Sequence, residues 1–176
     1  IDNALESGIL IIAVIYAIAA LFNLYIPNTG VDHRIPKKNP FFLYMPLTSP
    51  HTPWVVDKKF KNIGQLGDYG NFIAQTDDVV GQVVSRLKKL GIYENTLIIF
   101  SSDNGGAWTK KDIDKWHHNS NEGRRGQKAD VFDGGHHIPL IVSWKSKFDN
   151  KIFSQPVSLV DIFEFLILIS FQFHQI

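Results

Sequence analysis

The feature that most constrains the fold is a helical apolar pattern lying between two short apolar runs. Residues 66–90 carry apolar side chains at three- and four-residue spacing, with polar side chains on the opposite face. The flanking runs, residues 41–45 and 97–100, have the length and the bordering turn residues of buried strands. A strand, a helix and a strand in this order predict a βαβ unit. We therefore expect an α/β fold with a mostly parallel sheet flanked by helices.

The composition narrows the class of protein. The 176 residues are 44% hydrophobic and 20% charged, which suits a globular domain with its own core. The net charge of +1 gives no electrostatic reason to expect nucleic acid as a partner. Cysteine is absent, so the chain offers no disulfide, no thiolate metal ligand and no cysteine nucleophile.

An apolar run near the N-terminus, from Ile9 to Ile26, is interrupted only by Asn23. Its length approaches that of a membrane-spanning helix, but a buried core helix has the same appearance, and both interpretations stay open. Acidic residues precede the run and basic residues follow it, which favours a cytoplasmic C-terminal side. We divide the chain into an apolar segment with its linker, residues 1–38, and a folded region, residues 39–176.

The second predicted strand ends at a polar turn suited to bind a cation. Asp103 and Asn104 follow two serines, and two glycines come next. A carboxylate and an amide carbonyl are oxygen ligands for Ca²⁺ or Mg²⁺, and ligands gather at the carboxyl ends of strands in open α/β sheets. A solvated turn has the same composition, because Asp, Asn and Gly are common turn residues.

Two further residues have side chains that suit an anionic ligand. His51 follows the first predicted strand in a loop that three prolines stiffen. Histidine exchanges protons near neutral pH, although most loop histidines are simply solvated. Lys128 precedes a Gly-Gly turn and another apolar run, residues 138–144, and offers a point charge to an anionic group.

Five motifs, taken in order, resemble the middle-to-late part of the sulfatase catalytic domain, in the arylsulfatase-like branch of the alkaline phosphatase superfamily. The resemblance covers about residues 39–161 and implies an incomplete domain of that fold. The motifs are Pro50-His51-Thr52-Pro53, the helix with Tyr69, Asp77 and Gly81, the run that ends in Asp103-Asn104-Gly105, Arg125-Gly126-Gln127-Lys128, and Asp133-Gly134-Gly135-His136.

The resemblance implies a role for each candidate residue. Asp103 and Asn104 match the pair with which the family holds a divalent cation, usually Ca²⁺, against the sulfate oxygens. His51 matches the histidine that contacts the sulfate and the leaving-group oxygen, and Lys128 matches the lysine that precedes the family's Glu-Gly-Gly. The implied reaction is hydrolysis of a sulfate ester, whose developing negative charge a cation and an ammonium offset.

The departures from the family's pattern also matter. The family's nucleophile is a formylglycine made from Cys, sometimes Ser, in a Cys-x-Pro-x-Arg type motif, and this chain contains no such motif. It also lacks the early Asp-Asp pair that completes the metal site, while Asp133 and His137 replace the usual Glu and a frequent Arg. We therefore interpret the chain as a fragment that does not hydrolyse sulfate esters by itself.

Two other functions stay open. A non-catalytic, membrane-anchored remnant that binds a metal or a sulfated ligand would contact the membrane through the run from Ile9 to Ile26. A phosphatase or phosphodiesterase of the same superfamily needs more Asp and His metal ligands than this sequence supplies, so we rank it lower. The family's usual compartments are lysosomal, extracellular or periplasmic, which disagrees with the orientation that the charges around the apolar run favour.

Overall fold

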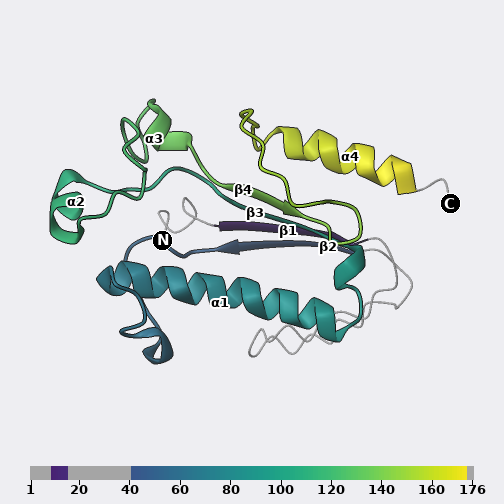
Figure 1. The fold of residues 1–176 in the computed structure, drawn as a ribbon, viewed down its shortest axis with the longest axis horizontal. Coiled ribbons are helices and arrows are strands. Elements are labelled where there is room, and N and C mark those ends of the chain that lie inside the picture. The colour runs from purple at the N-terminus through teal and green to yellow at the C-terminus, as the bar shows by residue number, and fades with distance from the viewer. Residues whose placement is uncertain (1–8, 16–40, 174–176) are drawn as a thin grey trace. The chain divides into compact units, whose positions relative to one another are not determined.

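Four strands form one sheet in the order β2-β1-β3-β4 (Figure 1). The computed structural model describes residues 9–15 and 41–173. The strands are β1 (Ile9–Ile15), β2 (Phe41–Leu47), β3 (Thr96–Ser102) and β4 (Leu140–Ser143). Ile9 of β1 stands opposite Leu47 of β2 and Ser102 of β3, and all three strand pairings are antiparallel. Because β1 runs against both neighbours, β2 and β3 run in the same direction without pairing.

The sheet is therefore not the mostly parallel one that the sequence predicted, although the α/β class and the order of β2, helix and β3 hold. The cause is the N-terminal apolar run, whose first part is rich in isoleucine and forms a strand between β2 and β3. A helix is thus wrong for Ile9–Ile15, and residues 16–26 lie outside the described residues. None of the helices described in residues 41–173 is long and apolar enough to cross a bilayer.

Helix α1 (Gly67–Lys89) confirms the helix predicted over residues 66–90. Val83 and Leu87 on its inner face pack with Ile92 and with Ile98 of β3 in one buried cluster. Burial of a side chain of this size contributes about 1.5–3 kcal/mol, so this cluster fixes the helix to the sheet. Gly91, which follows the end of the helix, has φ +71°, and its N–H donates to the carbonyl of Lys88 at 3.0 Å.

The polar segment after β3, residues 107–126, contains a short helix, α2 (Lys110–Trp116). Thr109 and Asp112 start this helix with a reciprocal cap: the Thr109 side chain accepts from the Asp112 N–H, and the Asp112 carboxylate accepts from the Thr109 N–H. The Gly-Gly turn lies within another short helix, α3 (Asp133–His136). The described residues also form the 3₁₀ helices η1 (Lys58–Phe60) and η2 (Tyr93–Asn95).

The chain divides into two compact units, Ile1–Ser146 and Lys147–Ile176. The second unit contains helix α4 (Asp161–Phe173), which is rich in apolar residues. At its start the Ser158 N–H donates to the Asp161 carboxylate at 2.9 Å. Large apolar side chains are exposed in this unit, among them Ile152, Phe153, Val160, Phe163 and Leu168.

Candidate active site

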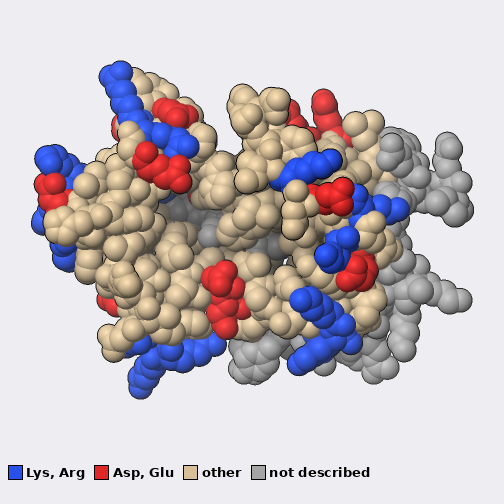
Figure 2. Space-filling model, viewed as in Figure 1, with Lys and Arg blue, Asp and Glu red and all other residues tan. Residues whose placement is uncertain are grey.

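A cavity of about 580 Å³ in the first unit brings the four predicted site residues together, since His51, Asp103, Asn104 and Lys128 all line it. The cavity lies between α1 and the strands β3 and β4, which contribute residues to its lining. Figure 2 shows a hollow in the surface that faces the viewer, and the residues around it are mostly uncharged. The sequence motifs that lie far apart in the chain thus share one site.

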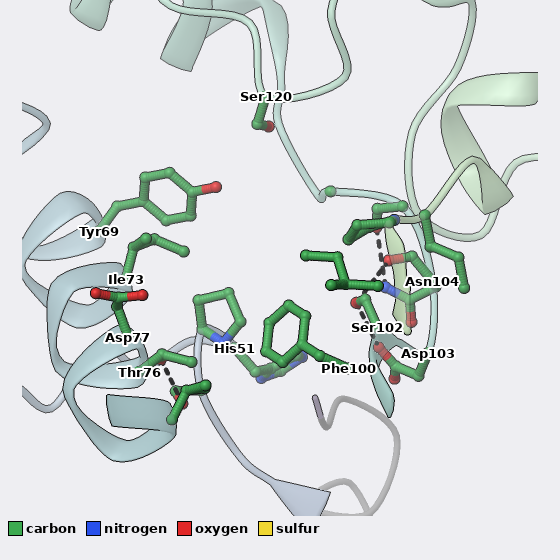
Figure 3. Close-up of a pocket in the computed structure, with 18 of the residues that line it drawn as sticks. His51, Tyr69, Ile73, Thr76, Asp77, Phe100, Ser102, Asp103, Asn104 and Ser120 are labelled. Atoms are coloured by element: carbon green, nitrogen blue, oxygen red, sulfur yellow. Dashed lines mark hydrogen bonds between the residues drawn. The ribbon is translucent and has the colours of Figure 1, made fainter. Parts of the chain in front are cut away.

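The side chains lie on two sides of the cavity (Figure 3). Tyr69 and Asp77 of α1 stand on one side, and Asp103 and Asn104 after β3 stand on the other. His51 lies between the two sides. A ligand in the cavity can therefore contact the polar turn and the helix at the same time.

The Asp103-Asn104 turn presents two oxygen atoms suited to a cation. The Ser102 hydroxyl donates to the Asn104 carbonyl at 3.1 Å, and the Asn104 amide nitrogen donates to the Gly105 carbonyl at 2.9 Å. The exposed Asp103 carboxylate accepts from the Ser102 hydroxyl at 3.4 Å through Oδ1, so its other oxygen stays available to a ligand, as does the Asn104 side-chain oxygen. Among residues 9–15 and 41–173, no group of three or more His, Cys, Asp or Glu side chains is placed to hold a metal ion.

His51 is held by hydrogen bonds within its own loop. Its N–H donates to the Thr48 carbonyl at 3.1 Å, and the Trp54 indole donates to the Pro50 carbonyl at 3.1 Å. The Nδ1 atom of His51 lies 2.5 Å from the Thr52 carbonyl oxygen. Because a carbonyl oxygen only accepts, Nδ1 carries a hydrogen, and Nε2 is the ring nitrogen left for a ligand.

Lys128 reaches the cavity because glycine-containing turns pack backbone against backbone. The Gly105 N–H donates to the Gly135 carbonyl at 2.8 Å, and the Lys128 N–H donates to the Gly106 carbonyl at 3.2 Å. A Cβ atom on Gly105 would lie 2.0 Å from the Gly134 carbonyl oxygen. Only glycine permits this approach, which places the lysine segment beside the Asp103-Asn104 turn.

Asn121, which the sequence analysis did not identify, joins the loops around the cavity. Its side-chain oxygen accepts from the Gly106 N–H at 2.9 Å, and its side-chain nitrogen donates to the Gly106 carbonyl at 2.9 Å and to the Gly126 carbonyl at 3.4 Å. The side chain is 7% exposed. It supplies the part-buried loop backbone with hydrogen bonds that no regular element provides there.

Three aromatic residues from three segments, Trp54, Tyr69 and Trp108, form an aromatic wall of the cavity. The ring centroids of Trp54 and Tyr69 are 5.5 Å apart, and those of Tyr69 and Trp108 are 4.5 Å apart. Burial raises the pKa of the Tyr69 hydroxyl above its ordinary value, and the nearby Ser120 hydroxyl opposes this effect. Tyr69 is therefore a neutral hydrogen-bonding group at physiological pH.

Asp77 is a cavity residue that the sequence analysis named only as part of a motif and did not place in the site. Its neighbour Asp78 contacts Lys59 at 3.3 Å and Gln82 at 2.6 Å. Asp77 lines the cavity instead. Its spacing of eight residues from Tyr69 places both on one face of α1, and this spacing was a signal that would have found it.

The two residues that depart from the family's pattern lie close together beside the cavity. Asp133 Oδ1 is 3.4 Å from His137 Nδ1, and Asp133 Oδ2 is 3.3 Å from the Arg124 guanidinium. His137 lines the cavity. The turn thus keeps an acidic residue beside basic ones.

Comparison with known proteins finds sulfatases. A family model described as Sulfatase matches residues 28–167. The chain is 33% identical to N-acetylgalactosamine-6-sulfatase of Rattus norvegicus over 128 residues, covering 72% of this chain and 24% of that protein. It is 30% identical to arylsulfatase H of Homo sapiens over 132 residues, covering 72% and 23%, and 30% identical to steryl-sulfatase of Rattus norvegicus over 129 residues, covering 72% and 22%. The chain thus spans about a quarter of the length of these relatives.

Proposed function

Because this chain belongs to the sulfatase family, we propose that it forms part of an active site that hydrolyses sulfate esters. The observation that carries the proposal is that His51, Asp103, Asn104 and Lys128 line one cavity. These residue types can together bind a sulfate group, hold a cation against it and assist the departure of an alcohol. Their individual roles are part of the proposal.

Asp103 and Asn104 fit a Ca²⁺ ion through a carboxylate oxygen and an amide oxygen. A bound cation supplies electrostatic stabilisation of the negative charge on sulfate oxygens. Lys128 contributes a second positive charge from the segment that packs beside the turn. Two protein ligands fill a minority of the roughly 6–8 coordination positions of Ca²⁺, so we expect this chain to bind the ion weakly.

His51 is the proposed proton donor to the ester oxygen that leaves. The Thr52 carbonyl occupies the hydrogen on Nδ1, so the protonated ring donates from Nε2. We assign the nucleophile to no residue of this chain, because the sequence has neither Cys nor the serine motif from which formylglycine forms. The family's formylglycine therefore does not fit any residue present.

Sulfate binding tests the proposal directly. We expect the chain to bind inorganic sulfate more tightly when Ca²⁺ is present, and we expect His51→Ala and Lys128→Ala each to weaken binding by about tenfold, the value of one hydrogen bond to a charged group. Lys145→Ala is the matched control, because this lysine is exposed and lies outside the cavity lining. Sulfate binding that none of the cavity variants changes would overturn the proposal.

Turnover provides the second test. We expect the purified chain not to release nitrophenol from nitrophenyl sulfate, because the nucleophile is missing from the sequence. Measurable turnover that disappears in His51→Ala would contradict this expectation and would require a different nucleophile in the same cavity.

A chain that binds sulfate esters without hydrolysing them is the second candidate function, and the lack of cysteine favours it. Sulfate binding without turnover in this chain agrees with both candidates. They are separated by adding the N-terminal part of a relative, with its nucleophile, as a second polypeptide. Restored turnover that depends on His51 supports the hydrolase, whereas binding without any restored turnover supports the second candidate.

A further inference from the structure

We propose that His137 is a further anion-binding residue of the cavity, and that its protonation makes the cavity bind an anion more tightly at acidic than at alkaline pH. The inference deepens the proposed function and rests on it, because the anion is taken to be the sulfate group bound beside Asp103 and Lys128. His137 departs from the family's usual pattern, so family membership does not decide what this residue does.

Two anchors place His137 beside the polar turn after β3. On its N-terminal side, the Gly135 carbonyl accepts from the Gly105 N–H at 2.8 Å. On its C-terminal side, the Pro139 carbonyl accepts from the Ser101 hydroxyl at 2.7 Å. The segment between these two hydrogen bonds therefore runs alongside the polar turn, and His137 lines the cavity there.

A cluster of charged side chains lies beside the His137 ring. The ring Nδ1 is 3.4 Å from Oδ1 of Asp133, and Oδ2 of Asp133 is 3.3 Å from Nε of Arg124. Nη1 of Arg124 is in turn 2.6 Å from Oε2 of Glu122. Charges from α3 and from the loop before it thus meet at one border of the cavity.

Other charged or titratable groups lie near this cluster. His136 precedes His137 on α3, and the Arg125 guanidinium is 3.5 Å from the centroid of the Phe132 ring. The test must separate His137 from the other histidines, because they change charge in the same range of pH. The remaining charged or titratable residues of the cavity lining are His51, Tyr69, Asp77, Tyr93, Asp103 and Lys128.

The net charge of the cluster depends on the protonation of His137. Arg124 lowers the pKa of the Glu122 carboxyl through a hydrogen bond and through its charge, and His137 adds to this effect. Glu122 is therefore ionised throughout the range in which histidine titrates. With a neutral His137 ring, two carboxylates and one guanidinium leave one negative charge beside the cavity, which repels an anion. A protonated ring balances that charge.

The contact with Asp133 also indicates which ring nitrogen of His137 changes. A carboxylate only accepts hydrogen bonds, so it favours a hydrogen on Nδ1, and Nε2 is left to gain or lose the proton. The His137 side chain is 52% exposed, so both solvent and a ligand can reach it. Because solvent screens a charge at such a position, we expect protonation to change sulfate affinity by about threefold to fivefold.

The test uses the full 176-residue chain, labelled with ¹⁵N, at a fixed concentration of Ca²⁺. Inorganic sulfate is titrated at about pH 8 and about pH 5.5, because histidine changes its charge in this range and sulfate does not. The indole signal of Trp54 reports binding, since this residue lines the cavity. We expect tighter binding at the lower pH, and a gain that exceeds the gain in His137→Gln by about threefold to fivefold.

Variants at two neighbouring positions assign the effect. His137→Arg carries a permanent positive charge, so it should bind sulfate more tightly than the unmodified chain at the higher pH. His137→Gln should match the unmodified chain at the higher pH and keep at the lower pH only the gain that other histidines supply. His136→Gln is the matched control and should keep the full gain, because His136 is exposed and lies outside the cavity lining.

The outcomes separate this inference from the proposed function. If Lys128→Ala weakens sulfate binding but His137→Gln keeps the full gain at the lower pH, the inference is overturned and the sulfate site stands. A His137→Arg variant that binds no more tightly than the unmodified chain at the higher pH would also overturn it. If sulfate binding at both pH values depends on neither Lys128 nor His51, the proposed sulfate site fails, and the inference fails with it.

Discussion

At the scale of single residues, Gly105 is required by a contact distance. Its Cβ would lie 2.0 Å from the Gly134 carbonyl oxygen, a backbone atom that cannot turn away. We expect Gly105→Ala to lower the free energy of unfolding by about 3 kcal/mol, because the turns must separate to admit the methyl group. Urea denaturation measures this change.

Gly81→Ala is the matched control, since nothing lies within 4 Å of a Cβ at this position of α1. Alanine is the better helix former, so we expect this variant to raise the free energy of unfolding by up to about 1 kcal/mol. If both variants changed the free energy of unfolding equally, close packing between the turns would not be the reason for glycine at position 105.

Asn121 makes the second prediction at this scale. Asn121→Ala removes the partner of the Gly106 N–H and one of the two donors to the Gly106 carbonyl, which leaves a part-buried N–H group without a hydrogen bond. We expect a loss of about 2 kcal/mol in the free energy of unfolding, measured by urea denaturation. Asn150→Ala, at an exposed position of the second unit, should change it by less than about 0.5 kcal/mol. A similar loss in both variants would contradict the joining role of Asn121.

At the scale of elements, the cap of α2 makes this short helix sensitive to acid. The Thr109 side chain donates to the Asp112 carboxylate and holds the pKa of that carboxyl below its ordinary value. A carboxyl group whose pKa is lower in the folded state than in the unfolded state stabilises the fold at every pH above its unfolded-state pKa. This stabilisation is lost as the pH falls through the folded-state pKa. We therefore expect α2 to fray below about pH 4.

The pKa of Asp112, followed by carboxyl NMR, checks this prediction. Thr109→Ala should raise the pKa of Asp112 toward its ordinary value, because this variant removes the side-chain hydrogen bond that lowers the pKa most. Thr109→Ser keeps a hydroxyl at the cap and should leave the pKa low. A low pKa in the alanine variant would mean that another group stabilises the carboxylate.

The elements also show what periodicity can and cannot predict. The sequence predicted α1 nearly to its ends, because one face packs on β3 through Val83 and Leu87 and the other is polar. It did not predict β1, because an unbroken apolar run has neither the period of a strand nor that of a helix. The pairing of Ile9–Ile15 with two strands decided its structure, and such long-range pairing has no local signal.

At the scale of the whole molecule, the motifs predicted that His51, Asp103, Asn104 and Lys128 belong together, and all four line one cavity. Strand ends and turns account for this, since they carry residues from distant parts of the chain to one edge of the sheet. The contributions of Asn121 and the aromatic wall were not predictable. They depend on contacts between loops, which leave no spacing pattern in the sequence.

The exposed apolar side chains of the second unit lead to a prediction for the complete chain. Ile152 is 100% exposed and Phe163 is 70% exposed, and apolar surface of this kind promotes association. We expect the chain to self-associate with rising concentration, and the double variant Ile152→Ser, Phe163→Ser to remain monomeric to a higher concentration. Sedimentation velocity measures this difference. The exposed Lys151→Ser variant should associate as the unmodified chain does, and association unchanged in the double variant would place the contact elsewhere.

The position of β1 has a consequence for how the sheet assembles. β2 and β3 are separated by the width of one strand and point in the same direction, so the space between them is bordered by two backbone edges of matching polarity. β1 supplies hydrogen-bond donors and acceptors to both of these edges. The continuity of the sheet therefore depends on the N-terminal strand, because β2 and β3 do not pair with each other.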